Sequence, residues 1–220
     1  GYELGNYFAS YAEHFSLNKC FRFRTEVTSV KPTSKSSAGS DAAASDAWSV
    51  EYRGEEGAGE ETFDGVVVAK GHYDDPYVPE IPGQESWLAA SASRRILHSR
   101  EYDDPNEFKG KSVLVVGGRS SAVDVARELR GVANWVYVLE KGCLEPTSVG
   151  QCTHLPLGSS LSPSGAIKLP NGAQATGEPV DVVILATGYK YVFPFLDSTE
   201  VGLHFGPVER YIEPLYEHIV

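Results

Sequence analysis

The stretch from Val113 to Leu129 constrains the fold of this 220-residue chain more than any other part of its sequence. Four apolar residues, 113–116, open the stretch and predict a buried strand of a parallel sheet. Gly117 and Gly118 come next, and two adjacent glycines predict a tight turn. A buried strand that ends in a glycine turn is typical of α/β folds.

A helix is expected directly after this turn. Ser120 or Ser121 can cap its N-terminus, because a serine hydroxyl accepts a hydrogen bond from the first backbone N–H groups. Strand, turn and helix predict a dinucleotide-binding βαβ unit, in which free N–H groups at the helix N-terminus bind a pyrophosphate. The second strand of the unit is expected from Trp135 to Leu139. The apolar residues expected on the buried helix face are Val123, Ala126 and Leu129.

The turn departs at one place from the usual Gly-x-Gly-x-x-Gly/Ala pattern. Gly117 fills the first place and Ala122 the third, but Arg119 stands where a glycine normally lets the backbone approach the pyrophosphate. The arginine side chain must therefore swing aside or pair with a phosphate. A purely structural strand–turn–helix is the alternative interpretation. The predicted nucleotide-binding residues of the turn are Gly117, Gly118, Arg119, Ser120, Ser121 and Ala122.

Charge and cysteine content argue against several kinds of partner. A formal net charge of −11 argues against binding to nucleic acid and to anionic membranes. No apolar run approaches the roughly 20 residues that span a bilayer. Cys20, Cys143 and Cys152 are widely spaced and form no Cys-x-x-Cys pair, so no metal site is predicted. An odd number of separate thiols fits a reducing intracellular compartment such as the cytoplasm.

The remaining segments are assigned from apolar periodicity and turn residues. Asp74–Gly83 holds three prolines and is predicted to be an ordered linker between domains. Val180–Gly188 is expected to be a buried strand that ends on a glycine. The other expected elements are a helix over 3–17, extended segments over 20–30 and 48–52, a loop over 32–47, a Gly/Glu turn over 54–61 and a buried strand over 63–69.

Three features occur in an order that resembles the flavin-containing monooxygenases. Ala69-x-Gly71-His72 follows one strand, the glycine turn follows the proline linker, and Leu185-Ala-Thr-Gly-Tyr189 ends the last strand. The turn itself, read as Gly-x-x-x-Ser-Ala-x-Asp, is similar to fungal-type members that lack the middle glycine. Further segments that look like the family are Tyr11–Phe15, Phe63–Val68, Val78–Gly83 and Phe108–Lys111.

The resemblance implies an α/β flavoprotein with two dinucleotide-binding domains, the NADPH domain complete and the FAD domain partial. Residues 1–83 would form part of the FAD-binding domain with the linker 74–83, residues 84–188 the Rossmann-like NADPH domain, and residues 189–220 the return to the FAD domain. No Gly-x-Gly-x-x-Gly occurs in residues 1–110. The chain is therefore expected to be an internal piece of a longer protein, without its FAD turn and its C-terminal segment.

The resemblance also implies a reaction. Full-length members use FAD, NADPH and O2 to oxygenate a nucleophilic nitrogen or sulfur of a small amine or sulfide, as N,N-dimethylaniline monooxygenases do. The flavin carries this chemistry, so no acid–base or nucleophilic residue is named, and the isolated piece is expected to be inactive. Lys70 and His72 are expected near the flavin. The remaining cofactor-binding residues are expected to be Gly71, Lys141, Thr187 and Gly188.

The family fingerprint, Phe-x-Gly-x-x-x-His-x-x-x-Tyr/Phe, is half present. His98 and Tyr102 keep the spacing of its end, whereas Ala92 and Arg94 stand at the Phe and Gly places. Two alternatives follow. A Baeyer–Villiger-type enzyme would end this fingerprint in Trp, which Tyr102 disfavours. A nucleotide-binding protein that has lost oxygenation would account for Arg119, the broken fingerprint and Lys70, where the family usually has Thr or Asn.

The choice between the two nicotinamide nucleotides depends on the end of the second strand. Glu140 lies 23 residues after Gly117, where an acidic residue usually accepts a hydrogen bond from the ribose 2′-hydroxyl of NAD. The family implies NADPH, and Lys141 or Arg119 can supply a cation for the 2′-phosphate. NADPH is therefore the expected nucleotide, and NADH is the alternative.

Overall fold

The computed structural model describes residues 2–33 and 47–214 and divides them into two compact units. The first unit contains residues 1–70, 192–207 and 211–220, and the second contains residues 71–191 and 208–210. The expected linker 74–83 thus lies in the second unit, and its residues form neither helix nor strand. Each unit is treated below by itself.

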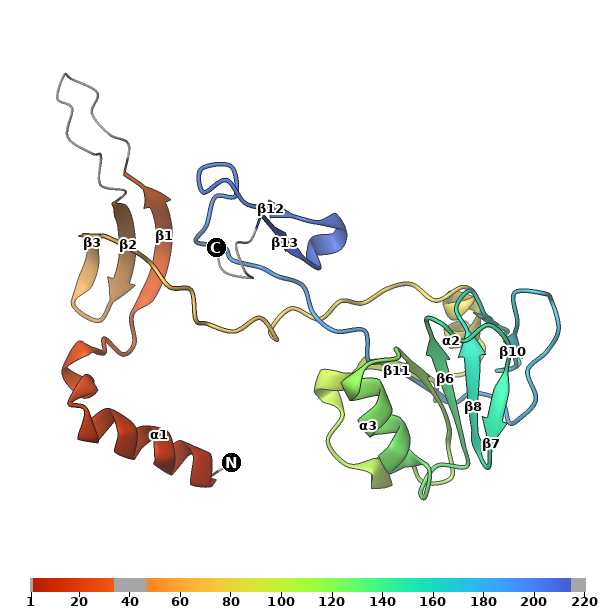
Figure 1. Ribbon diagram of the computed structural model, residues 1–220. Coiled ribbons are helices and arrows are strands. Elements are labelled where there is room, and N and C mark those ends of the chain that lie inside the picture. Colours follow the sequence, from red (N-terminus) through yellow and green to blue (C-terminus); the bar gives the residue numbers. More distant parts are fainter. Residues whose placement is uncertain (1, 34–46, 215–220) are drawn as a thin grey trace. The chain divides into compact units, whose positions relative to one another are not determined.

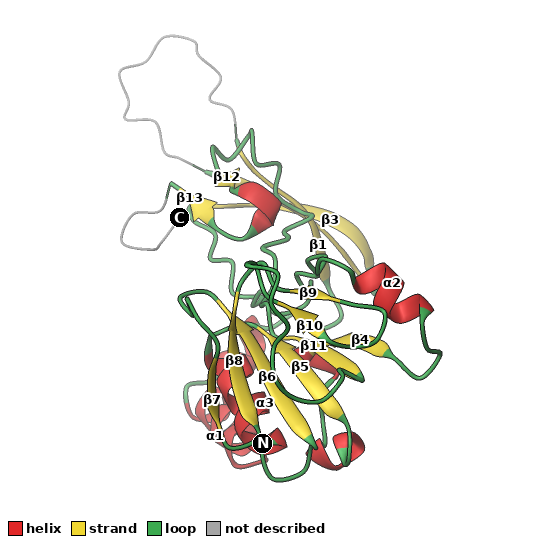
Figure 2. Ribbon diagram, turned by 90° about the vertical axis from the view of Figure 1, so that its right-hand side faces the viewer, coloured by secondary structure: helices red, strands yellow, loops and turns green. Residues whose placement is uncertain are grey.

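A six-stranded sheet organises the second unit (Figures 1 and 2). All neighbouring strands are parallel except the edge strand β7, which is antiparallel to β8. In spatial order the strands are β4 (Arg95–His98), β11 (Val182–Leu185), β5 (Ser112–Val116), β6 (Trp135–Glu140), β8 (Cys152–Pro156) and β7 (Thr147–Val149). The expected strands at 113–116, 135–139 and 180–188 are all found in this sheet, and the α/β fold class is confirmed.

Both faces of this sheet are buried, which explains why its strands are continuous apolar runs. Val113 and Val115 of β5 pack on one side in a cluster with residues of helix α3 (Ser120–Leu129). Leu114 and Val116 pack on the other side with Trp87 and other apolar residues. The elements that supply this second layer are α2 (Gln84–Ala89) and the hairpin of β9 (Ser160–Leu161) and β10 (Ile167–Lys168).

The first unit is built on an antiparallel sheet of β1 (Glu26–Pro32), β2 (Trp48–Gly54) and β3 (Gly57–Phe63). The backbone N–H of Val30 donates to the carbonyl of Phe195, so the chain returns to this sheet after leaving the second unit. The remaining elements are α1 (Tyr2–His14), the hairpin β12 (His204–Phe205) and β13 (Ile212–Glu213), and the short helices η1 (Leu17–Cys20), η2 (Ser99–Glu101), η3 (Pro105–Phe108) and η4 (Pro207–Glu209).

Two predictions for the first unit are wrong. The Gly/Glu turn over 54–61 shrinks to residues 55–56, because β3 already begins at Gly57. Gly59 lies within β3, next to the ring of Tyr52. A Cβ on Gly59 would lie 2.7 Å from Cζ of that ring, so the glycine makes room for the ring in the strand. The expected buried strand over 63–69 is absent: Phe63 ends β3, and Val67 is 90% exposed. A strand needs at least one neighbour to accept its backbone hydrogen bonds, and none of the described strands lies beside residues 64–69.

The expected N-terminal helix is present but its apolar face is not covered. None of the residues of α1 is buried among the described parts of the chain. Tyr7 and Phe8 are both 60% exposed, and Tyr2 is 94% exposed. Exposed aromatic side chains at helical spacing form an apolar surface of the kind that normally packs against other protein. Residues 34–46 of the predicted loop lie outside the described residues.

Candidate functional site: the carboxyl edge of the parallel sheet

The glycine turn lies between β5 and α3, where its backbone touches both neighbouring strands. Gly117 has φ +139°, a conformation that side chains rarely adopt, and a Cβ on it would lie 2.3 Å from the carbonyl oxygen of Ala186. A Cβ on Gly118 would lie 2.9 Å from Oε2 of Glu140. Position 117 therefore requires glycine, because the backbone that follows β11 approaches it closely, whereas a side chain at Gly118 would displace the side chain of Glu140 on β6.

The N-terminus of α3 offers backbone donors to a ligand. Its cap residue is Arg119, which makes no side-chain capping hydrogen bond, so the prediction that Ser120 or Ser121 caps the helix is wrong. The first intrahelical bond runs from the N–H of Val123 to the carbonyl of Arg119. The N–H groups of residues 120–122 have no acceptor among the described residues, and Ser120 and Ser121 are exposed. Such a helix start is suited to an anion.

The buried face of α3 differs from the predicted one by about one residue. Val123 is 56% exposed, whereas Ala122 and Val125 are buried. The small side chain of Ala122 is fully buried, which fits the close helix–strand packing expected of the third place of the motif. Ala126 and Leu129 are buried as predicted.

Sheet register brings the other predicted residues to the same edge. Leu185, Val116 and Leu139 are aligned across β11, β5 and β6, so the residues that follow them meet at the carboxyl ends of the strands. Lys141 follows directly after β6, and Thr187 and Gly188 follow β11. Ligands of open α/β sheets bind outside this edge. The side chains of Lys141 and Arg119 are not ion-paired with any carboxylate in the described part of the chain.

Two connecting segments run side by side next to this edge (Figure 1). The N–H of Tyr77 donates to the carbonyl of Gly188 at 2.9 Å, and the N–H of Lys190 donates to the carbonyl of Asp75 at 2.8 Å. The hydroxyl of Thr187 donates to the carbonyl of Tyr77. Thr187, which was predicted to bind cofactor, therefore holds the backbone at Tyr77 in place and has a structural role.

The residues expected near the flavin fall in different units. The ammonium of Lys70, in the first unit, lies 5.2 Å from the ring centre of Phe193. Gly71 has φ +77°, and His72 stacks on Tyr191 with ring centres 4.5 Å apart in the second unit. His72 is thus packed in an aromatic environment, and Lys70 takes part in a cation–π contact.

The residues of the half-present fingerprint have structural partners. Nε2 of His98 donates to the carbonyl of Gly188 at 3.1 Å, and Nδ1 accepts from the N–H of Arg100, which fixes the neutral Nε2–H tautomer. Burial lowers the pKa of His98 below its ordinary value. The hydroxyl of Tyr102 donates to Glu128 at 2.9 Å, and its pKa is raised, first by burial and then by this bond.

Arg94, at the glycine place of the fingerprint, braces the local loop. Its Nη1 donates to the carbonyls of Trp87 and Pro163, each at 2.7 Å, and its guanidinium lies over the Trp87 ring. Trp87 is fully buried and donates from Nε1 to the carbonyl of Val180. Ala92 lies in an exposed turn. The arginine therefore replaces the flexibility of glycine with specific contacts.

The sequence-based prediction missed His154, which binds the acidic residue at the ribose position. Nδ1 of His154 on β8 lies 2.6 Å from Oε1 of Glu140 at the end of β6. Both side chains are partly buried, with 32% and 26% of their surface exposed. Only the pairing of β6 with β8 brings the two together, so no local sequence pattern could have indicated the contact.

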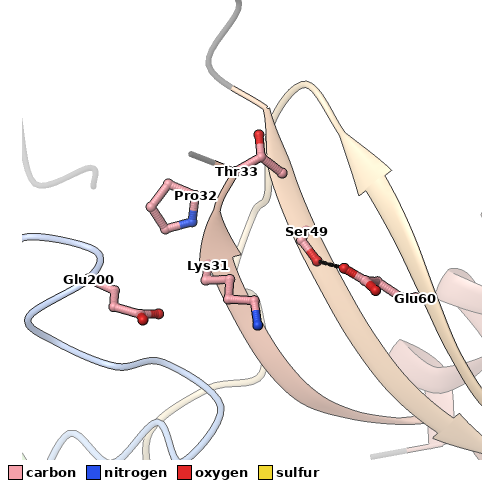
Figure 3. A pocket seen from close by; sticks show the side chains of 6 residues that line it. All are labelled: Lys31, Pro32, Thr33, Ser49, Glu60 and Glu200. Atoms are coloured by element: carbon pink, nitrogen blue, oxygen red, sulfur yellow. Dashed lines mark hydrogen bonds between the residues drawn. The ribbon is translucent and has the colours of Figure 1, made fainter. Parts of the chain in front are cut away.

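A shallow pocket in the first unit (Figure 3) is lined by Lys31, Pro32, Thr33, Ser49, Glu60 and Glu200. Three of these side chains are already paired: Ser49 donates to Glu60, and Lys31 forms an ion pair with Glu51. Within residues 2–33 and 47–214, no group of His, Cys, Asp or Glu could hold a metal ion, and no helix is long and apolar enough to cross a membrane.

The turn fits a dinucleotide pyrophosphate. Three unpaired N–H groups at a helix start, a glycine that admits no side chain and two unpaired cationic side chains supply donors and charge for it. No second glycine turn of this kind occurs among residues 2–33 and 47–110, so the described residues hold no equivalent pyrophosphate site for FAD.

Comparison with known proteins gives a consistent result. Residues 2–143 match the family model described as "Flavin-binding monooxygenase-like". Flavin-containing monooxygenase FMO GS-OX5 of Arabidopsis thaliana is 32% identical over 223 residues, which covers 99% of this chain and 44% of the relative. FMO GS-OX-like 6 from the same plant is 30% identical over 221 residues, covering 99% and 43%.

Solved structures agree with this match. S-allyl-L-cysteine S-oxygenase from Allium sativum superposes with a TM-score of 0.74 at 27% identity, covering 98% of this chain and 46% of that protein. Tmm from Pelagibacter sp. strain HTCC7211 gives a TM-score of 0.58 at 28% identity, covering 80% and 36%. The two-dinucleotide-domain flavoprotein fold is confirmed, and the chain spans less than half of the length of these relatives. The chain belongs to the flavin-binding monooxygenase-like family.

Proposed function

We propose that the second unit binds NADPH for a flavin-dependent monooxygenase. The observation that carries the proposal is the start of α3, where the N–H groups of residues 120–122 have no acceptor in the described part of the chain, beside a turn in which Gly117 admits no side chain. FAD and NADPH are the cofactors of this family. The full-length protein would then use NADPH and O2 to oxygenate a small nucleophilic substrate.

Each predicted residue has a specific task in this proposal. The N–H groups of Ser120, Ser121 and Ala122 would bind the pyrophosphate, and Gly117 and Gly118 would keep the approach to them clear. Arg119 and Lys141 would supply positive charge to the phosphates. Held by these residues, NADPH would supply a hydride, and the flavin of the full-length protein would supply the chemistry with O2. Gly71 and Gly188, with φ of +77° and +78°, would let the two connecting segments turn close to the cofactors.

We propose the domain division 1–83, 84–188 and 189–220, with the first and last ranges in the FAD-binding domain. Two exposed apolar features of the first unit support this assignment: the uncovered face of α1 and the 90% exposed Val67. Both would be buried against the rest of an FAD-binding domain. Lys70 and His72 would lie near the flavin.

The proposed substrate is a small sulfide or amine. One relative supports sulfur, since it is named an S-allyl-L-cysteine S-oxygenase. Tyr102 argues against a Baeyer–Villiger-type reaction, because that fingerprint ends in Trp. Lys70 and Arg94 favour a second candidate, a nucleotide-binding protein without oxygenation. NADPH oxidation by the full-length protein separates them: stimulation by a thioether or tertiary amine supports oxygenation, and substrate-independent oxidation with peroxide release supports the second candidate.

Nucleotide binding is tested directly with the 220-residue chain by titration calorimetry with NADPH. Arg119→Ala is expected to weaken binding by about tenfold, because a charge-assisted contact to phosphate contributes about 1.5–3 kcal/mol. Arg130→Ala is the matched control, since Arg130 is an exposed arginine at the other end of the same helix. Equal affinities for the two variants, or no binding by the unmodified chain, would refute the proposal.

The chain by itself is expected to be inactive and to retain flavin poorly, because residues 2–33 and 47–110 hold no second glycine turn that could bind the pyrophosphate of FAD. The measurement is the visible absorption spectrum of the purified chain after incubation with FAD and gel filtration. A yellow protein with one flavin per chain would contradict this expectation.

A further inference from the structure

Glu140 and His154 form a hydrogen-bonded pair beside the glycine turn. An acidic residue at the end of the second strand of a dinucleotide unit usually accepts a hydrogen bond from the adenosine ribose 2′-hydroxyl, whereas a 2′-phosphate at that place meets like charge. We propose that Glu140, positioned by His154, reads the 2′ position of the nucleotide and allows this site to accept NADH as well as NADPH. This inference rests on the proposed function, nucleotide binding at the turn.

The two oxygens of the carboxylate have different surroundings. Oε1 lies 2.6 Å from Nδ1 of His154, which is a short hydrogen bond. Oε2 lies on the side of the turn, since a Cβ on Gly118 would be 2.9 Å from it. One oxygen is thus fixed by the imidazole and the other lies next to the backbone that would hold the nucleotide. Glu140 therefore combines a fixed orientation with an acceptor at the turn.

His154 is the donor that holds this carboxylate. It is aligned with Val138 on the neighbouring strand β6, and its other ring nitrogen lies 3.9 Å from Sγ of Cys152. On the edge strand β7, Thr147 is aligned with it. In the described part of the chain, no lysine or arginine is ion-paired with Glu140. No such cation therefore screens the carboxylate from a 2′-phosphate bound at this edge, and the orientation of the carboxylate depends on the imidazole of His154.

The opposing charges at this edge should make the site discriminate only weakly between NADH and NADPH. Glu140 favours the 2′-hydroxyl of NADH, whereas Arg119 and Lys141 favour the 2′-phosphate of NADPH. We therefore expect the dissociation constants of the two nucleotides for the unmodified chain to differ by less than about tenfold, because each effect corresponds to roughly one order of magnitude in affinity.

The test is titration calorimetry of the 220-residue chain and four variants with NADH and with NADPH. Glu140→Gln keeps the size of the side chain and removes its charge, so NADH binding should weaken and NADPH binding should tighten, shifting the ratio of affinities at least about tenfold toward NADPH. His154→Ala should shift the ratio in the same direction by a smaller factor. His154→Gln, which retains a donor, should restore part of the loss. Glu145→Gln is the control, because it removes an exposed charge from the loop after β6.

The ratio of the two affinities distinguishes a positioning role of His154 from a general structural role, because loss of structure would weaken the binding of both nucleotides together. An unchanged ratio in Glu140→Gln, or a preference of the unmodified chain for NADPH above about tenfold, overturns the inference and leaves nucleotide binding intact. If neither nucleotide binds the unmodified chain, the proposed function fails and the inference fails with it.

Discussion

Replacing Gly117 by alanine should destabilise the second unit far more than a typical substitution. The new Cβ would lie 2.3 Å from the carbonyl oxygen of Ala186, and the φ of +139° is outside the left-handed helical region that other residues tolerate. Backbone strain of this kind costs about 1–3 kcal/mol. Forcing β11 and the turn apart costs about 1–3 kcal/mol more. The expected loss in the free energy of unfolding is therefore about 4 kcal/mol.

Gly110→Ala is the matched control. Gly110 also has a positive φ, +71°, but a Cβ there would meet no atom within 4 Å. Its substitution should cost only the left-handed strain, about 1–2 kcal/mol. The comparison therefore separates the close approach of Ala186, together with the unusual φ of Gly117, from the ordinary cost of replacing a glycine with positive φ.

The assay is urea unfolding followed by tryptophan fluorescence in a Trp48→Phe background. The signal then comes from Trp87 and Trp135, both in the second unit. A difference of about 2 kcal/mol between the variants should separate their midpoints by about 1 M urea, given a slope of about 2 kcal/mol per molar. Equal midpoints would refute the idea that strand packing, and not only backbone conformation, requires glycine at 117.

Three further outcomes are expected. Burial keeps the pKa of His98 below its ordinary value. The contribution of neutral His98 to the free energy of unfolding should therefore be complete above about pH 6.5 and should decrease as the pH falls below it, toward the folded-state pKa. A His98→Gln variant that loses as much stability toward urea between about pH 7 and 5.5 as the unmodified chain would contradict this expectation. Arg94→Gly restores the glycine of the family fingerprint but removes two 2.7 Å hydrogen bonds, and should lower the free energy of unfolding by about 2–4 kcal/mol. An unchanged midpoint in thermal unfolding would contradict the stabilising role of Arg94. Asp181→Ala should cost about 1–3 kcal/mol, because the N–H of buried Ser112 loses the carboxylate that accepts it at 2.9 Å; Asp181→Asn retains an acceptor and should cost less, as the same denaturation experiment would measure.

The fold of the second unit could be predicted from the sequence because its strands are buried on both faces. Residues 113–116, 135–139 and 182–185 are uninterrupted apolar runs, of which the first ends at Gly117 and the second at Glu140. The glycine turn was predictable for a related reason: Gly117 is required by its contact with Ala186, and such a requirement leaves a strong local pattern. The cap of α3 is Arg119 and not Ser120 or Ser121, so the helix begins slightly earlier than predicted.

The errors occur where a segment depends on partners far away in the sequence. The valines at 66–68 have the composition of a parallel strand, but strand formation needs neighbours, and Val67 has none in the described chain. The contact between His154 and Glu140 depends on which strand lies next to β6, and the sequence does not indicate this order. Residues that recognise ligands through such pairings are therefore harder to predict than glycines that shape a turn.

The side-by-side course of residues 75–77 and 188–190 has a consequence for modularity. Because the entry and exit of the second unit are hydrogen-bonded to each other, its ends are already joined in space. Cutting out such a segment, or inserting it into a surface loop of an unrelated host, opens almost no gap and adds little loop-closure entropy. Residues 71–191 are therefore expected to tolerate excision, or insertion into a loop of another protein, because their two ends already lie side by side.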